Sequence, residues 1–315
     1  MHTPSPLSGK LVTVFGGSGF LGNYVAQSLL KNGARVRIAS REPEKAYALQ
    51  PLANLGQMQF ARCNILDERS VEQCVAGVDG VVNLVGAFEG NLIALMGTAA
   101  GTIAQKASDA GATRMVQISA IGADADSPVD YSRGKGLGEQ LVAEHFPEAT
   151  ILRPSIIFAQ DDEFVNMFAK LIRTMPVLPV FGPDARLQLT FADDVADAIV
   201  TALEHPERHG GKTYELGGPE KLTMMEINRR IAAAQGRKKT FIPMPDEVSG
   251  VFASLPGTPM SSDQWALLKK GSVVGDDALG YGELGIEPRP LSLFLDRWMQ
   301  RYRKQGRFSD PRYAA

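Results

Sequence analysis

A doubly wound α/β fold, with a parallel sheet and a smaller α/β lobe at the C-terminal side, is the fold class that this 315-residue sequence predicts. Short, continuously apolar segments alternate with segments of helical spacing as far as residue 158. This alternation is typical of a parallel sheet that is covered by helices on both faces. A glycine cluster also separates the first apolar segment from the first helical one, which is the position of a phosphate-binding turn in such folds.

The first part of the chain contains six predicted strands and three predicted helices. The strands are the apolar runs at residues 11–15, 35–39, 59–61, 80–85, 114–119 and 150–152. The helices, in which apolar residues recur at helical spacing, are residues 23–32, 92–110 and 131–145.

The regular alternation ends after residue 158. Further helices are predicted at residues 164–174, 192–203, 223–234 and 291–303, with a strand at 213–216. Residues 245–262 contain several Ser, Pro and Gly residues and predict a long loop over a site or a linker. We therefore expect a dinucleotide-binding core at residues 1–158 and a smaller C-terminal lobe at 159–315, with residues 185–216 returning to the core.

The composition excludes several classes of protein. With 44% hydrophobic residues the chain can build a large core, and no run reaches the ~18 apolar residues of a membrane helix. A net charge of -2 excludes a globally basic nucleic-acid-binding surface. The polar first ten residues predict neither a signal peptide nor a transit peptide, so we expect a cytoplasmic protein. Cys63 and Cys74 lack metal-ligand spacing, which predicts reduced thiols and no metal site.

The glycine cluster predicts a Rossmann-type dinucleotide site. Gly16 allows the tight turn that leaves the first strand, Gly19 lets the backbone approach a pyrophosphate, and Gly22 allows close helix–sheet contact. Phe20 and Leu21 follow at the helix start, where free backbone amides and the helix dipole face the phosphates.

The end of the second strand bears on the choice of cofactor. An NAD site needs an Asp or Glu about 20 residues beyond the glycines, to bind the ribose hydroxyls. Here Ser40 and Arg41 occupy that place, and an arginine can bind a 2′-phosphate through two parallel hydrogen bonds. Lys45 adds a further positive charge. These residues favour NADP over NAD, whereas the alternative is an exposed Arg41 that pairs with Glu42 or Glu44.

Three polar residues form a candidate catalytic set. Tyr131 and Lys135 lie four residues apart on one face of a predicted helix, and Ser119 ends the preceding strand. In such a set the lysine holds the nicotinamide ribose and lowers the pKa of the phenol. The tyrosine then exchanges a proton with a substrate carbonyl, to which the serine donates a hydrogen bond. Each residue alone has an ordinary structural explanation, as a strand end or as an exposed helix face.

The sequence resembles the extended short-chain dehydrogenases/reductases, which are similar to NAD-dependent epimerases and dehydratases. Three patterns carry this resemblance: Gly16-x-x-Gly19-x-x-Gly22, Tyr131-x-x-x-Lys135 and Arg153-Pro154. Finer segments resemble the atypical branch that contains the NADPH-binding accessory subunit of respiratory complex I; they are residues 118–123, 152–158, 214–220, 262–264 and 285–288.

The resemblance implies a modified Rossmann core that holds the cofactor with the glycine turn, Arg41, Tyr131 and Lys135, and with the backbone at Pro154 beside the nicotinamide. It further places Asn64 beside the adenine, where many relatives have Asp, and includes Ile65 among the cofactor-binding residues. The chain departs from the family pattern at three other places: Phe15 replaces a threonine, Ala159 replaces a glycine, and Met96 or Gly97 stands where many active relatives have an Asn. The last departure weakens the case for a proton relay.

Two functions remain open at this point. The first is an NADP(H)-binding subunit or assembly factor of respiratory complex I or of ubiquinone synthesis, in which the nucleotide is chiefly structural. The second is an NADP-dependent reductase, epimerase or dehydratase that acts on a small carbonyl or sugar-like substrate.

The C-terminal segment could serve the first function by docking on a partner or on the inner face of an anionic membrane. Its basic residues are Arg297, Arg301, Arg303, Lys304 and Arg307, and its aromatic residues are Trp298, Tyr302 and Phe308. The alternative is the exposed face of a terminal helix.

Overall fold

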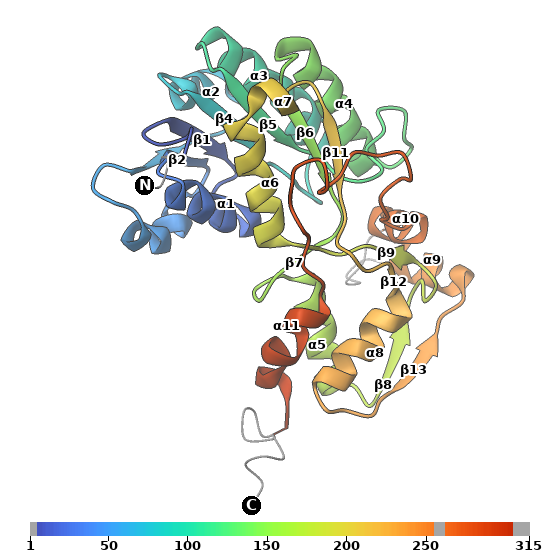
Figure 1. Cartoon of the computed structure of the whole chain (residues 1–315). Helices are drawn as coiled ribbons and strands as arrows, with labels where there is room; N and C mark the ends of the chain where they lie inside the picture. Colours follow the sequence, from blue (N-terminus) through green and yellow to red (C-terminus); the bar gives the residue numbers. More distant parts are fainter. Residues whose placement is uncertain (1–4, 255–261, 305–315) are drawn as a thin grey trace, which may run out of the picture. The chain divides into compact units, whose positions relative to one another are not determined.

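The chain forms two compact units in a computed structural model that describes residues 5–254 and 262–304 (Figure 1). The first unit consists of Met1–Pro154, Ala192–Leu216 and Gly275–Glu287. The second consists of Ser155–Phe191, Gly217–Val274 and Pro288–Ala315. The chain therefore leaves the first unit after the sixth strand of its sheet and returns to it twice.

A seven-stranded parallel sheet lies at the centre of the first unit, in the order β11-β6-β5-β4-β1-β2-β3. The strands are β1 (Leu11–Phe15), β2 (Arg35–Ser40), β3 (Met58–Arg62), β4 (Gly80–Asn83), β5 (Arg114–Ile118), β6 (Thr150–Pro154) and β11 (Thr213–Leu216). The chain winds outward from β1 in both directions, which confirms the predicted doubly wound fold. The carboxyl ends of β1 and β4 thus form the switch point at which such sheets bind ligands.

Helices cover both faces of this sheet (Figure 1). Two of them, α1 (Phe20–Lys31) and α6 (Ala192–Glu204), pack side by side. A second row consists of α2 (Glu68–Val75), α3 (Ala99–Asp109) and α4 (Asp130–His145). The remaining helical segments are the 3₁₀ helix η1 (Pro43–Leu52), the π-helical turn η2 (Ile93–Thr98) and the short α7 (Pro206–His209). The predicted helix 92–110 is therefore a π turn followed by an α-helix.

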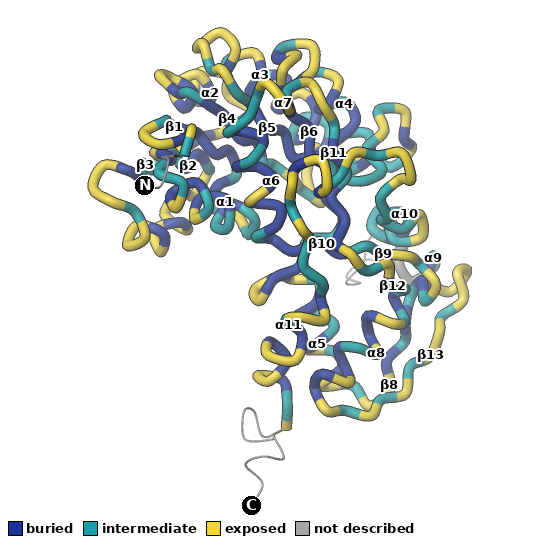
Figure 2. Tube along the Cα trace, in the orientation of Figure 1, coloured by how far each residue is buried: buried dark blue, intermediate teal, exposed yellow. Residues whose placement is uncertain are grey.

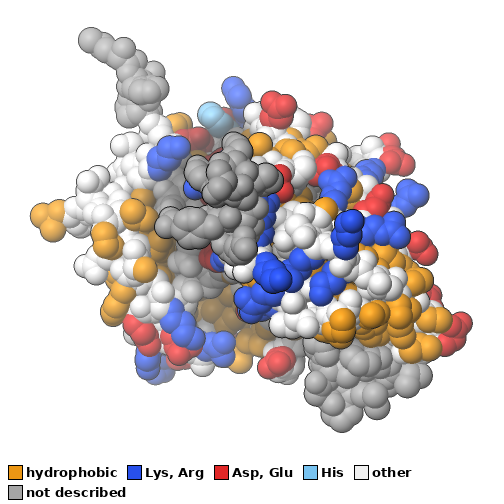
Figure 3. Space-filling view, turned by 90° about the horizontal axis from the view of Figure 1, so that it is seen from below, with side chains coloured by type: hydrophobic (Ala, Val, Ile, Leu, Met, Phe, Trp, Pro, Cys, Tyr) orange, Lys and Arg blue, Asp and Glu red, His pale blue; other side chains and the backbone are white. Residues whose placement is uncertain are grey.

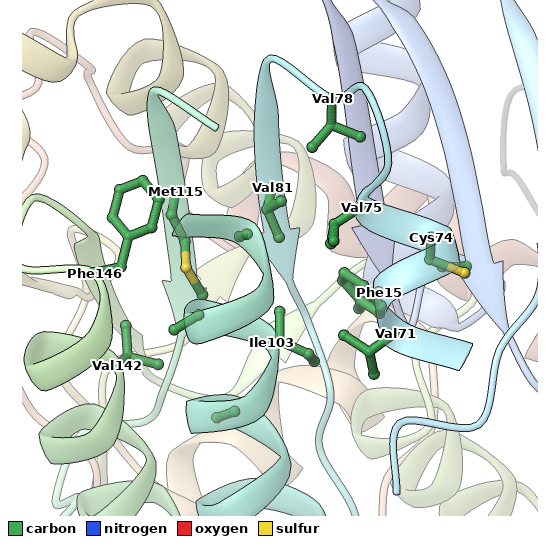
Figure 4. Packing of buried hydrophobic residues seen from close by; sticks show 14 of the residues in the cluster. Phe15, Val71, Cys74, Val75, Val78, Val81, Ile103, Met115, Val142 and Phe146 are labelled. Carbon is green, nitrogen blue, oxygen red and sulfur yellow. The ribbon is translucent and has the colours of Figure 1, made fainter. Parts of the chain in front are cut away.

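The core between the sheet and the second row of helices is apolar and closely filled. Figure 4 shows Phe15, Val81 and Met115 of the sheet facing residues of α2, α3 and α4. Phe15 and Ile103 have no exposed surface, and burying one such side chain contributes roughly 1.5–3 kcal/mol. Thr13 is also buried in β1, and its hydroxyl donates a hydrogen bond of 2.7 Å to the carbonyl of Cys74. Figure 2 shows the resulting buried layer along the central strands.

The second unit contains three two-stranded pairings and five longer helices among its described residues. The pairings are β7 (Ile157–Phe158) with β10 (Thr190–Phe191), β9 (Arg186–Leu187) with β12 (Leu222–Thr223), and β8 (Val177–Val180) with β13 (Thr240–Pro243). The helices are α5 (Phe164–Thr174), α8 (Met224–Ala234), α9 (Asp246–Ser254), α10 (Ser262–Lys270) and α11 (Ser292–Met299), with the 3₁₀ turn η3 (Gln300–Tyr302) after them.

The prediction of a long loop at residues 245–262 was wrong for its described part. Helix α9 begins there, with Asp246 and Glu247 in its first turn, where acidic side chains interact favourably with the helix dipole. The loop prediction was based on the Ser, Pro and Gly content and left out the two acidic residues that favour the start of a helix. Residues 255–261 lie outside the described part of the chain. In the described ranges no helix combines the length and the hydropathy that crossing a membrane requires.

Candidate nucleotide-binding site

The glycine turn between β1 and α1 offers an open backbone. Gly16 has a φ of +75°, in the left-handed region that favours glycine. A Cβ on Gly22 would collide with the backbone of Gly17, so the first turn of α1 lies against the turn that precedes it. No side chain caps the N-terminus of α1, and its first turn holds no acidic residue. Its free amides are therefore available to an anion such as a pyrophosphate.

The spacing rule did not identify Gly17 as a required glycine. A Cβ there would lie 2.9 Å from the carbonyl oxygen of Val14 and 3.0 Å from Cδ1 of Ile38. The turn is thus pressed onto β1 and β2, and only hydrogen fits. The adjacent Gly16-Gly17 pair was the available sequence signal.

Ser40 and Arg41 lie next to this turn, at the carboxyl end of β2. The hydroxyls of Ser18 and Ser40 are 2.9 Å apart and share a hydrogen bond. Arg41 is exposed and makes no ion pair within the described part of the chain. Of the two acids that the sequence offered as partners, Glu42 pairs with Lys45 at 2.5 Å instead. The Arg41 guanidinium is therefore free to bind an anion.

Asn64 and Ile65 follow β3, the strand beside β2. The Asn64 side-chain oxygen accepts from the backbone N–H of Leu66 at 3.2 Å, and its backbone N–H donates to the hydroxyl of Ser70 at 3.0 Å. Asn64 is exposed, while Ile65 is half-buried against the core of the unit. Both residues thus lie at the sheet edge that carries the glycine turn, with an exposed amide available for hydrogen bonding.

Ser119 and Lys135 come together at the carboxyl ends of β4 and β5. The Lys135 ammonium donates to the carbonyls of Val85 and Ile118, at 3.0 Å each. Burial lowers the pKa of Lys135 to about 8, against the opposing charge of Glu139. Ser119 follows Ile118, and its buried hydroxyl oxygen finds no hydrogen-bond partner in the described ranges. An unpartnered buried hydroxyl is unfavourable, so this atom fits a site that a bound molecule completes.

Tyr131 lies in the first turn of α4, one turn before Lys135. Its ring stacks on the half-exposed Phe88, with centroids 4.8 Å apart and an interplanar angle of 7°. Burial raises the pKa of Tyr131 to about 12. Burial is the cause of this shift, while the Lys135 ammonium is bonded to two carbonyls. That Lys135 lowers the pKa of the phenol in the catalytic set stays a prediction.

Arg153 has a structural function that its sequence context did not indicate. Its guanidinium binds both carboxylate oxygens of Glu139, at 2.8 and 2.6 Å, and lies 3.6 Å from Glu215. These hydrogen bonds raise the pKa of Arg153. The ion pairs join α4 to β6 and β11, so Arg153 and Pro154 end a strand rather than form a free turn. The carbonyl of Pro154 accepts a hydrogen bond from the N–H of Ile121.

Glycines bring η2 and α3 very close to α4. A Cβ on Gly101 would lie 2.8 Å from Cβ of Leu141, and one on Gly97 would lie 2.8 Å from Cδ2 of Leu137. A Cβ on Gly138 would collide with the carbonyl oxygen of Met96. The position at which many relatives have an Asn therefore serves helix contact in this chain and supplies no polar side chain.

Comparisons with known proteins agree with this geometry. The model of the NAD dependent epimerase/dehydratase family matches residues 12–217. The mitochondrial NADH dehydrogenase (ubiquinone) 1 alpha subcomplex subunit 9 of Arabidopsis thaliana is 30% identical, over 96% of this chain and 80% of that protein. The subunit of the same name from Mus musculus is 31% identical, over 95% and 82%.

Among solved structures, the triphenylmethane reductase of Citrobacter sp. complexed with NADP(H) has the same fold. Its TM-score is 0.74 at 20% identity, and the match covers 91% of this chain and 99% of that chain. The family match extends over well more than half of the sequence and includes the glycine turn, Ser119, Tyr131 and Lys135. The chain therefore belongs to the NAD dependent epimerase/dehydratase family.

Proposed function

We propose that this protein binds NADP(H) and acts as a subunit or assembly factor of respiratory complex I or of quinone synthesis. One observation carries the proposal: the similarity to the subunit-9 proteins continues past residue 217, where the family match ends, and covers 95–96% of the chain. The similarity to these relatives thus includes the second unit. These relatives are named as subunits of NADH dehydrogenase (ubiquinone).

The residues of the first unit fit a nicotinamide dinucleotide, which supplies a transferable hydride when bound. The amides of Gly19, Phe20 and Leu21 would hold the pyrophosphate, because α1 begins without a side-chain cap. Ser40 and Arg41 would bind the 2′-phosphate, since no carboxylate stands there to bind a ribose diol. These contacts favour NADP(H) over NAD(H).

The remaining contacts would lie along the same sheet edge. Asn64 and Ile65 would contact the adenine, Tyr131 and Lys135 the nicotinamide ribose, and the backbone at Pro154 the nicotinamide. With its pKa near 12, the Tyr131 phenol is protonated at neutral pH and can donate a proton or a hydrogen bond. This state suits a residue that holds a nucleotide, and the proposal needs no turnover.

Purification of the tagged chain from its native cells tests this proposal. We expect co-purification of complex I or quinone-synthesis proteins, and release of NADP(H) on denaturation. A Gly22→Val variant, whose side chain would collide with Gly17, serves as the matched control that loses the nucleotide. Recovery of the wild-type chain alone, or with NAD(H), would contradict the proposal.

A reductase function is the second candidate, and the unpartnered hydroxyl of Ser119 favours it. A protein that only holds a nucleotide needs no hydroxyl at the point where a substrate carbonyl would lie. We expect Tyr131→Phe to abolish NADPH oxidation with a small carbonyl and to leave NADPH binding intact. Tyr47→Phe, which alters an exposed tyrosine on η1, is the control. Equal turnover in Tyr131→Phe would exclude a proton-transfer role.

Membrane contact through the C-terminal segment is not part of the proposal. Trp298 and Tyr302 are buried in the second unit rather than exposed. Arg301 bonds to the carbonyl of Gln160, and Arg303 donates to the carbonyl of Ala234 at 2.9 Å. Four residues of this basic segment thus serve the unit itself, while Arg307 and Phe308 lie outside the described residues. The face of the molecule that Figure 3 shows carries both acidic and basic side chains.

A further inference from the structure

A second arginine lies beside Arg41 at the adenosine end of the site. Arg62 is the last residue of β3, and in the parallel pairing of β2 with β3 its Cα lies opposite that of Ser40. Neighbouring strands are about 4.8 Å apart. The backbone N–H of the next residue, Cys63, donates to the carbonyl of Ser40 at 2.8 Å, which holds the two strand ends in this register.

The fold itself makes little use of the Arg62 side chain. Its side chain is 77% exposed, and its ion pair with Glu44 is long, at 3.9 Å. An exposed pair of this kind contributes roughly 0–1 kcal/mol or nothing measurable. The other acid of this segment, Glu42, is bonded to Lys45, so neither acid neutralises Arg62 by a close contact.

Arg41 and Arg62 act on the same small region. The pKa of Glu42 is lowered first by its hydrogen bond to Lys45 and then by charges that include both arginines. The charges of both guanidinium groups therefore act on one carboxylate, and the two arginines belong to adjacent strand ends. Ser40, whose hydroxyl bonds to that of Ser18, directly precedes Arg41 in the chain and is the register partner of Arg62.

We infer that Arg62 is a second specificity-determining residue, which binds the 2′-phosphate of NADP(H) together with Arg41. This inference rests on the proposed function, since it concerns the same nucleotide site. A phosphate monoester carries nearly two negative charges and has three free oxygens, so it can accept hydrogen bonds from two guanidinium groups. The uncharged 2′-hydroxyl of NAD(H) gains far less from a second arginine. Arg62 therefore makes the site discriminate between NADP(H) and NAD(H), and it adds little to the binding energy that the two nucleotides have in common.

Titration of the whole protein with NADPH, NADH, 2′,5′-ADP and ADP tests this inference without any turnover. Three variants are compared with the wild type: Arg62→Ala, Arg41→Ala and Arg35→Ala. Arg35 is the matched control, because it is an exposed arginine at the opposite end of β2. Arg62→Lys is added to separate charge from geometry, since a lysine cannot make two parallel bonds to one phosphate.

We expect Arg62→Ala to weaken the binding of NADPH and 2′,5′-ADP about tenfold or more, which is the effect of losing one charged hydrogen bond. The affinities for NADH and ADP should stay within about twofold of the wild type. Arg62→Lys should fall between Arg62→Ala and the wild type, and Arg35→Ala should match the wild type. If Arg62→Ala keeps the wild-type ratio of NADPH affinity to NADH affinity while Arg41→Ala loses this preference, the role of Arg62 is refuted and that of Arg41 stands. A wild type that binds NADPH no better than NADH would overturn the proposed cofactor as well.

Discussion

Replacing Gly101 by alanine tests the close approach of α3 and α4. In isolation the change should favour the helix, because alanine exceeds glycine in helix propensity by about 1 kcal/mol. Here the new Cβ would lie 2.8 Å from Cβ of Leu141. Carbon atoms in contact prefer about 3.5–4.0 Å, so the two helices must separate by roughly 0.7–1.2 Å.

The cost of that separation should exceed the gain in propensity. Both Cβ atoms are fixed to their backbones, so no rotamer change relieves the contact. We therefore expect a cost of about 2–3 kcal/mol, in the upper part of the roughly 1–3 kcal/mol that overpacking typically costs. We expect a net loss of about 1–2 kcal/mol in the free energy of unfolding. With a urea m-value of about 2–3 kcal/mol/M, the midpoint should fall by about 0.3–1 M.

Urea unfolding followed by far-ultraviolet circular dichroism measures this shift. Gly250→Ala is the matched control, because Gly250 lies in α9 and its added Cβ would meet only Nε1 of Trp265, at an ordinary 3.7 Å. That variant should be as stable as the wild type or slightly more so. If Gly101→Ala unfolds at the wild-type urea concentration or above it, the inferred contact between α3 and α4 is wrong.

Three further predictions concern buried charges. The pKa of Lys135 is about 8 in the fold and near 10.5 in the unfolded chain, so the free energy of unfolding of the wild type should rise with pH between these values. Lys135→Met lacks this titrating group, so the difference in the free energy of unfolding between wild type and Lys135→Met should change over pH 7, 8, 9 and 10. The same difference at every pH would contradict the lowered pKa. Glu139→Gln should lower the free energy of unfolding by about 1–2 kcal/mol, because the bidentate bond from Arg153 is weakened; thermal melts beside the exposed Glu148→Gln check this, and equal melts would refute it. Asp162→Ala should cost about 1–3 kcal/mol, since the backbone N–H groups of Ala159 and Val165 lose their acceptor; urea titration measures it, and an unchanged midpoint would count against these bonds.

The sequence could predict those parts of the fold and site that depend on local spacing. The apolar run before Gly16 and the helical spacing after it suffice to place the glycine turn on β1 and α1. Tyr131 and Lys135 share a helix face because they are four residues apart, wherever that helix lies. Such relations are set by backbone geometry within one or two elements, so they can be predicted without the tertiary structure.

Relations between distant segments could not be predicted in the same way. Arg62 lies beside Ser40 because β2 and β3 pair in one particular register, and a shift of a single residue would turn its side chain to the other face. The stacking of Phe88 on Tyr131 depends on a loop conformation that no periodicity describes. The need for glycine in η2, α3 and α4 depends on the residue that the facing helix places opposite each of them, such as Leu141 opposite Gly101.

The two hydrogen bonds of Lys135 have a consequence for nucleotide affinity. Its ammonium is already fixed between the carbonyls of Val85 and Ile118 before any nucleotide arrives. Ordering a free side chain on binding costs about 0.5–1.5 kcal/mol, and this lysine has lost that freedom during folding. If the nucleotide binds as proposed, its ribose would therefore replace or add an acceptor at a donor that the carbonyls of Val85 and Ile118 already hold in place.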